Sequence, residues 1–283
     1  PVFDRILRRS AIIQLSQSPT FKIVSDDAIA STLRLMRPSA EVELSAVHER
    51  EACIREGAEA VLQGEVDRVA RRYVVSMQAV ACQSGEHLAS VAAQADEAGA
   101  ILDAMSSEMN KLRAKLGESM RSIERYDRPV RAATTESLEA YQLFSAAADR
   151  WRFGPDASAA IPLFERALQI DPQFALAYSY LGSLLGNLGE LDRAVAAHRK
   201  AFELRDRVSE REKLTITATY HSFVSGNIEA EIATNEQWRA QYPHDWIAPM
   251  NLAGIYSDFV GDYARTLQFA EESLRLEPRQ AYA

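Results

Sequence analysis

The second half of the chain repeats a pattern of small and large apolar residues about every 34 positions. Counting back from Pro172, Ala167, Phe164 and Ala160 stand five, eight and twelve residues earlier. Small residues at such steps let two antiparallel helices approach closely, while large ones fill the space between successive pairs. The pattern therefore predicts helical hairpins that pack side by side.

This spacing resembles the tetratricopeptide repeat (TPR). The next unit has the first-helix residues Tyr178, Leu181, Gly182 and Leu185, and its partner helix has Ala194 and Ala201. The third unit, 209–243, keeps the period but has Glu231, Asn235 and Trp238 where other residues are usual. The fourth, 251–263, regains the pattern with one extra residue near its turn. The resemblance implies about four hairpins in an all-α solenoid, whose concave groove binds a peptide or protein partner.

The TPR register also implies which first-helix side chains face that groove. They are Gln142, Asp149, Arg152, Ser179, Ser183, Asn187, Lys213, Thr217, Tyr220 and His221. Chaperone-binding TPR domains hold a C-terminal carboxylate in a dense clamp of Lys, Asn and Arg. Arg152, Asn187 and Lys213 are at most a partial version of that clamp.

Residues 1–128 alternate between helical and strand periods. Apolar residues from Phe3 onward predict a helix to about Ser16, and FKIVS (21–25) predicts a short strand. Two more helices follow, one capped by Asp26 or Asp27 and one that ends at Gly57. The remaining elements are strands over 60–69, 72–82 and 87–95 and a helix over about 96–116. This order predicts an α+β domain, with helices on a mainly antiparallel sheet.

The two patterns predict a division into two parts. We expect the α+β domain over 1–118, a connector over 119–134 and TPR hairpins over 135–283. Pro129 and the Ala-Thr-Thr run before Ser137 place the boundary.

Several motifs in the first part resemble the small α/β domain of TolB-like and CsgG-like envelope proteins. The match consists of Gly57-Ala58, Val61 and Gly64, with Ser84-Gly85 at a hairpin turn. Such domains begin with a strand before the first helix, so its absence, like the first residue Pro1, favours a chain truncated at its N-terminus. The closing AYA (281–283) looks like the opening of a further repeat.

The run LRAKLGES…ATTESLEAY (112–141) resembles the region after the membrane helix in bacterial eukaryotic-type Ser/Thr protein kinases with TPR repeats. AFELRDRVSEREK (201–213) and QYPHDW (241–246) are also typical of that region. The resemblance implies a sensor region on the extracytoplasmic side of a bacterial membrane, attached through an upstream segment. The alternatives are the equivalent region of a membrane-anchored winged-helix transcription regulator and an envelope assembly scaffold.

Charge separates the two parts and excludes one class of partner. There are 19 acidic and 17 basic residues up to Arg128, and 21 and 15 after it, which gives net charges of −2 and −6 and a total of −8. This balance argues against a nucleic-acid surface, and an acidic groove would favour basic or neutral peptides. No apolar run reaches the length of a membrane span, and no signal peptide is present in the sequence.

The sequence offers no constellation for catalysis, a cofactor or a metal. Kinase motifs are missing, and the glycines 182, 186 and 189 are explained by helix contact and a turn. The five histidines lack metal-ligand spacing. Cys53 and Cys82 can either form a disulfide in an oxidising compartment or stay as two buried thiols. We therefore expect a protein that is not an enzyme. A homodimer remains open.

Overall fold

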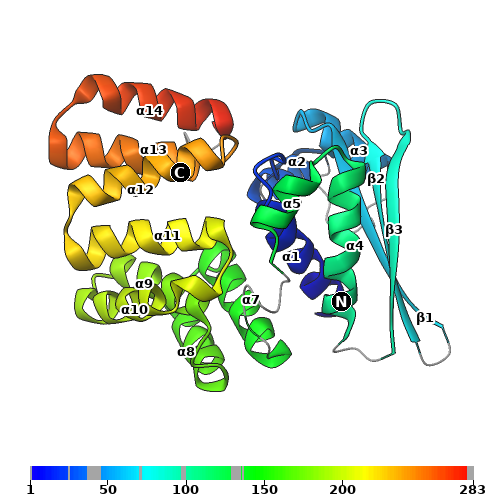
Figure 1. Ribbon diagram of the computed structural model, residues 1–283, viewed down its shortest axis with the longest axis horizontal. Helices are drawn as coiled ribbons and strands as arrows, with labels where there is room; N and C mark the ends of the chain where they lie inside the picture. The colour runs from blue at the N-terminus through cyan, green and yellow to red at the C-terminus, as the bar shows by residue number, and fades with distance from the viewer. Residues whose placement is uncertain are drawn as a thin grey trace. The chain divides into compact units, whose positions relative to one another are not determined.

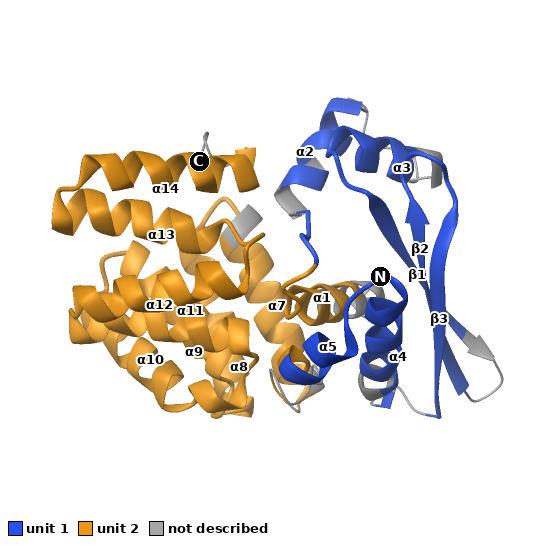
Figure 2. Ribbon diagram, turned by 45° about the horizontal axis from the view of Figure 1, so that its top comes forward, with its two compact units in different colours: residues 1, 21–125 blue, residues 2–20, 126–283 orange. Residues whose placement is uncertain are grey.

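The computed structural model describes residues 2–24, 26–36, 46–69, 72–96, 100–128, 135 and 137–278. The chain divides into two compact units (Figure 2). The sheet unit contains Phe21–Arg125 together with Pro1, and the repeat unit contains Val2–Thr20 and Tyr126–Ala283. The chain is mostly helical, with one small antiparallel sheet in the described residues.

The sheet consists of β1 (Ala60–Val69), β2 (Arg72–Ala81) and β3 (His87–Ala95), in that spatial order (Figure 1). Both pairings are antiparallel, with a register shift at Ala79/Val80. Buried and exposed residues alternate along β3, because successive side chains point to opposite faces of a strand. The three strands match the predicted ranges to within one residue.

The described residues of this part also form the helices α2 (Asp26–Met36), α3 (Ala46–Arg55), α4 (Ile101–Lys115) and α5 (Met120–Tyr126). Helix α4 packs on β3 and buries Met105, Met109 and Leu112. Helix α3 is followed by Gly57, whose φ of +66° suits the predicted helix-ending glycine.

The predicted strand at FKIVS (21–25) is wrong for the residues that the structure describes. Residues 21–24 have no strand structure, and Ser25 lies outside the described residues. In the described sheet, β1 pairs with β2 and β2 pairs with β3. Residues 21–24 pair with none of these strands. In the residues of the sheet unit that the structure describes, the order is therefore two helices, three strands and two helices.

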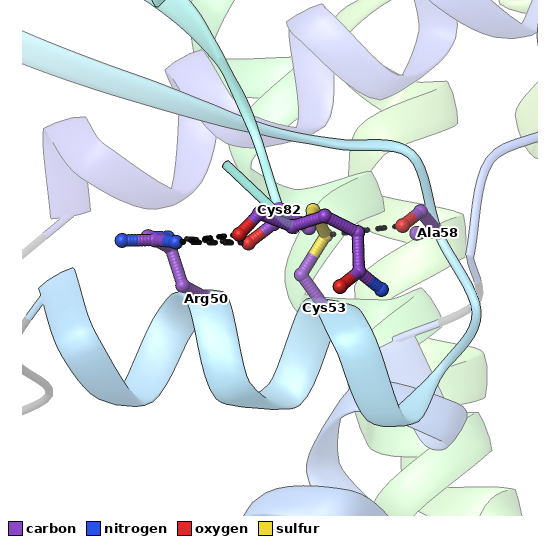
Figure 3. The surroundings of a disulfide bond; sticks show 5 residues. Arg50, Cys53, Ala58 and Cys82 are labelled. Carbon is purple, nitrogen blue, oxygen red and sulfur yellow. Dashed lines mark hydrogen bonds between the residues drawn. A yellow bond between two sulfur atoms is a disulfide. The ribbon is translucent and has the colours of Figure 1, made fainter. Parts of the chain in front are cut away.

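Cys53 of α3 and Cys82, just after β2, form a disulfide (Figure 3). Their Cα atoms lie 5.9 Å apart, within the range that a disulfide requires. The guanidinium of Arg50 donates hydrogen bonds to the carbonyl oxygens of Cys82 and Gln83. The side chain of Arg50 and the disulfide therefore tie α3 to the β2–β3 turn.

The repeat unit contains four consecutive helical hairpins between residues 138 and 276. Their first helices are α7 (Leu138–Phe153), α9 (Ala175–Asn187), α11 (Glu210–Tyr220) and α13 (Ile247–Ile255). Their second helices are α8 (Ile161–Ile170), α10 (Leu191–Glu203), α12 (Ile228–Gln241) and α14 (Tyr263–Leu276). Short turns of helix connect them at η2 (Ala157–Ala160), η3 (Arg205–Arg207), η4 (His221–Ser225) and η5 (Tyr256–Val260).

Small residues allow the close helix contacts that the pattern predicted. A Cβ atom on Gly182 would come within 2.9 Å of the His198 ring. Ala194 and Ala201 of α10 are fully buried. At the first hairpin, the Phe144 ring contacts Phe164, with a centroid distance of 5.9 Å.

The third and fourth hairpins each have a five-residue π-helical turn, η4 and η5, at the end of the first helix. Each turn ends at a left-handed glycine, Gly226 or Gly261. The next residues, Asn227 and Asp262, then cap the following helix through their side chains. The π turn accommodates the extra residue seen in the sequence of the fourth unit.

Helix α1 (Val2–Ser16) belongs to the repeat unit, although residues 1–118 were expected to form one domain. Gln17, which follows α1, accounts for this difference. Its amide donates to the carbonyl of Arg128 at 3.0 Å and accepts from the Arg128 N–H at 2.7 Å. The expected connector is described only in part, since residues 129–134 lie outside the described residues.

Candidate peptide-binding groove

The register of the first helices can be read from their glycine turns. Gly226-Asn227 and Gly261-Asp262 are equivalent because both follow a π turn and start a capped helix. This equivalence pairs each residue of α11 with the residue 35 positions later in α13.

Packing contacts identify two covered sides of α11. Ile216 packs with Ala175 and Ala201 of the preceding hairpin. Leu214 packs with Trp238 and Tyr242 of its own hairpin. Two sides of α11 lie between these contacts. The 3.6-residue period of a helix places Thr217 on one of these sides and Thr219 on the other.

The fourth hairpin shows which of those two sides is open. Leu252, the equivalent of Thr217, is fully buried in a cluster with Phe269 of α14. Met250, the equivalent of Thr215, is 42% exposed, and Gly254, the equivalent of Thr219, is exposed as well. The open side of the first helices is therefore the side of Thr215 and Thr219.

We call the residues on this open side the groove row. The alignment of Gly182 with Ala218 makes Ser183 the equivalent of Thr219, and Asn187 lies one turn after Ser183 on the same face of α9. The groove row is thus Ser183, Asn187, Thr215, Thr219, Met250 and Gly254.

The residues predicted on α9 agree with this side of the helix. Ser183 is half-buried and Asn187 is exposed. Ser179 has the same register but is only 3% exposed. Ser179 is therefore not available to a ligand at the surface.

The residues predicted on α11 lie on the other side of this helix from the groove row. Lys213 forms an ion pair of 2.5 Å with Asp206, which follows α10. Tyr220 stacks on Phe202 of α10, with ring centroids 3.8 Å apart. His221 lies beside the same Phe202 ring, and burial lowers its pKa.

Thr217 belongs to this second set of residues, because its equivalent is the buried Leu252. The groove row on α11 is therefore two residues out of step with the predicted set. Aligning the Gly-Asn and Gly-Asp turns in the sequence would have located Thr215 and Thr219. The π turn hides that alignment from a fixed 34-residue count.

The remaining predicted residues lie on α7. Gln142 is exposed and Asp149 is half-buried. Arg152 lies in α7, but its side chain is outside the described residues. The partial carboxylate clamp consisted of Arg152, Asn187 and Lys213. Lys213 pairs with Asp206 on the other side of α11, so among the described side chains Asn187 alone lies on the open side.

The hydroxyl groups of the groove row donate to their own helices. Ser183 donates to the Ser179 carbonyl at 3.1 Å, and Thr215 donates to the Arg211 carbonyl at 3.1 Å. Thr219 donates to the Thr215 carbonyl at 3.2 Å. A hydroxyl whose proton is used in this way keeps its oxygen lone pairs as acceptors. The groove row is therefore uncharged and offers mainly hydrogen-bond acceptors.

Two sequence motifs meet beside this row. Arg211, from the SEREK segment, pairs with Asp245 of QYPHDW at 2.7 Å. The same carboxylate oxygen accepts a hydrogen bond of 2.9 Å from the indole N–H of Trp238. These contacts fix the start of α11 to the loop between α12 and α13.

The described residues contain no group of three or more His, Cys, Asp and Glu placed to hold a metal ion. In the same part of the chain, no helix has both the length and the apolar character needed to cross a membrane.

Comparison with known proteins supports the repeat assignment for part of the chain. Residues 163–196 match the family model "Tetratricopeptide repeat". A 74-residue stretch, 26% of this chain, is 40% identical to the cell division cycle protein 27 homolog of Caenorhabditis elegans. That match spans only 9% of the relative's length.

Two crystal structures of MamA resemble the chain at 16% sequence identity and a TM-score of 0.35. The alignments cover 66% and 64% of this chain, and 98% and 88% of the MamA chains. The repeat match and the four hairpins together show that this part of the chain is built of tandem helical hairpins.

Proposed function

We propose that the groove row binds a segment of a partner protein, in an extended or helical conformation. The observation that carries this proposal is the open side of α9, α11 and α13, which is lined by uncharged side chains, most of them small. Small residues leave room for a ligand, and the hydroxyl oxygens accept hydrogen bonds from it. The groove would perform no chemistry.

The acceptor character of the groove row indicates the chemistry of the ligand. Main-chain N–H groups and the side chains of Asn, Gln, Lys and Arg are donors that suit such a surface. The net charge of −6 after Arg128 favours the same neutral or basic peptides. A peptide bound through its C-terminal carboxylate is disfavoured, because Lys213 is paired on the other side of α11.

We further propose that the chain is the regulatory, extracytoplasmic region of a membrane Ser/Thr kinase. The motifs of 112–141, 201–213 and 241–246 support this through their family resemblance. The disulfide between Cys53 and Cys82 favours an oxidising compartment. Occupancy of the groove would then be passed to the kinase. Kinase motifs in the upstream reading frame would support this placement, whereas a winged helix or a lipoprotein signal would replace it.

Peptide selection tests the proposed groove. A phage-displayed library of random peptides is selected on the purified chain, and the enriched peptides are titrated against variants. Asn187→Arg and Thr215→Arg should weaken binding at least about tenfold with little change in melting temperature. Failure to enrich any peptide would contradict the proposal. If binding survives both changes but is lost when the exposed β2 residues Arg72 and Gln78 are substituted, the interaction belongs to the sheet unit.

A further inference from the structure

One carboxylate of the third hairpin is buried where the neighbouring hairpins carry smaller, uncharged residues. Glu231 of α12 donates its backbone N–H to the cap residue four positions earlier. Ala194 of α10 and Thr266 of α14 make the same bond to their own caps and are therefore its equivalents. Ala194 is fully buried, and Glu231 is only 9% exposed. A glutamate at this position places a carboxylate where the second hairpin buries a methyl group.

The described residues supply no cation for this carboxylate. The ion pairs of the third hairpin involve other acidic groups, as Arg211 with Asp245 and Arg239 with Glu272 show. In the same part of the chain, Glu231 has no lysine, arginine or histidine as an ion-pair partner. A carboxylate that is taken out of water without a cation costs stability. The burial of Glu231 therefore needs an explanation outside the packing of the repeat.

Ser222 of η4 places the carboxylate of Glu231 beside the groove row. The Ser222 hydroxyl donates a hydrogen bond to this carboxylate. Along α11 and the turn that continues it, Thr215, Thr219 and Ser222 follow one another at i, i+4 and i+7, a spacing that puts them on one face of a helix. Ser222 is exposed. The groove row on α11 is therefore followed by a hydroxyl that holds a buried carboxylate.

The start of α12 does not require this carboxylate. Asn227 caps the helix by accepting a hydrogen bond of 2.9 Å from the Ala230 N–H. Glu229 places a negative charge in the first turn, where the helix dipole favours it, and stays exposed to water. Glu231 carries a desolvation cost that these residues avoid. Burial raises its pKa, and the hydrogen bond from Ser222 offsets only part of that rise.

We propose that Glu231 binds the guanidinium or ammonium group of an Arg or Lys side chain in the peptide that occupies the groove row. This inference rests on the proposed peptide-binding function and names the side chain that one end of the groove selects. The carboxylate is already desolvated, and hydrogen bonds between ionised partners are strong in such surroundings. Arginine is the better ligand, because its planar, weakly hydrated guanidinium matches the geometry of a carboxylate.

A single carboxylate at one end of the groove also sets the position of the bound peptide. The groove row itself is uncharged, so a basic side chain gains an ionic contact only where it reaches Glu231. Charge complementarity of this kind fixes register more than it adds affinity. The peptide is therefore expected to carry its basic residue at one fixed position relative to the residues that contact Thr215 and Thr219.

Parallel phage selections test the inference. A random peptide library is selected on the whole chain and on Glu231→Gln, which keeps the shape of the side chain and removes its charge. The wild-type chain should enrich Arg or Lys at one position of the aligned peptides, and selection on Glu231→Gln should not. Glu229→Gln is the matched control, because Glu229 is an exposed glutamate of the same helix, and it should preserve the enrichment.

An enriched peptide is then titrated against the same proteins. Glu231→Gln should weaken binding at least about tenfold, because it leaves the peptide cation without its partner. Glu229→Gln should change binding less than about twofold. Replacing the basic residue of the peptide by Gln should weaken binding to the wild type and remove the difference between wild type and Glu231→Gln. This peptide variant tests the contact without altering the protein.

Enriched peptides with no preferred basic position, or equal binding by wild type and Glu231→Gln, would overturn the inference. Thr219→Arg separates this failure from failure of the groove. Peptides that lose affinity for Thr219→Arg but not for Glu231→Gln would leave the groove in place and remove the role of Glu231. A selection that enriches no peptide on the wild-type chain would contradict both proposals.

Discussion

Phe223 stacks on His198, with ring centroids 4.8 Å apart and ring planes inclined by 24°. His198 is fully buried, and neither ring nitrogen has a hydrogen-bond partner in the described structure. Burial therefore lowers the pKa of His198 from 6.5 to about 4. The neutral imidazole acts as an apolar group between the second and third hairpins.

This pKa predicts that the repeat unit loses stability in mild acid. The unfolded chain takes up a proton near pH 6.5, whereas folded His198 resists it until about pH 4. The contribution is therefore fully present above about pH 6.5 and is lost as the pH falls toward 4. The loss should reach about 2 kcal/mol by pH 5. Urea denaturation at pH 7.5 and pH 5 measures it.

His198→Phe provides the control for this prediction. Carboxyl groups also titrate in this range; desolvation, for example, raises the pKa of buried Glu212. Subtracting the variant's pH dependence from that of the wild type isolates the histidine. Identical pH profiles for the two proteins would show that His198 is not held neutral.

Trp238→Ala should lower the free energy of unfolding by about 3–5 kcal/mol. Trp238 is fully buried, and its removal leaves a cavity beside Leu214 and Tyr242. It also leaves Asp245 with Arg211 but without the indole N–H. The exposed neighbour Gln237 supplies the control, since Gln237→Ala should cost less than about 0.5 kcal/mol. Equal chemical-denaturation midpoints for Trp238→Ala and the wild type would refute the packing of Trp238 described here.

Cys53 and Cys82 should give no free thiol when the unreduced chain is unfolded and labelled. Their sequence separation is 29, and closing a loop of that length stabilises the folded state by about 3–4 kcal/mol in the chain-entropy model. The double variant Cys53→Ser, Cys82→Ser should lower the denaturation midpoint of the sheet unit accordingly. Two labelled thiols in protein from an oxidising compartment would count against both the disulfide and the extracytoplasmic proposal.

The sequence predicted elements wherever a local pattern determines the structure. Alternation located β1, β2 and β3, and the glycine after a predicted helix of the first part located the end of α3 at Gly57. The predicted hairpins follow from small residues such as Gly182. Each of these features depends on neighbours in sequence or on one repeated spacing.

The features that the sequence did not predict depend on contacts between residues far apart in the chain. The pairing of Gln17 with Arg128 joins residues 111 positions apart, and no spacing predicts it. A single extra residue in η4 shifts the register of α11 relative to its turn. Thr217, rather than Thr219, was therefore predicted in the groove. Asn235, which departs from the repeat pattern, is buried and hydrogen-bonded to the Glu231 carbonyl.

The comparison of Thr219 with Thr217 tests the central claim most directly. Both are half-buried threonines of α11 whose hydroxyls donate to their own helix, but only Thr219 belongs to the groove row. A peptide enriched by phage display is titrated against Thr219→Arg and Thr217→Arg. The milder pair Thr219→Val and Thr217→Val is titrated in the same way. Circular dichroism melts verify that each variant is folded. We predict at least about tenfold weaker binding for Thr219→Arg, a smaller loss for Thr219→Val, and less than about a twofold change for both Thr217 variants. Equal effects at the two positions, or a larger effect at Thr217, would contradict the groove described.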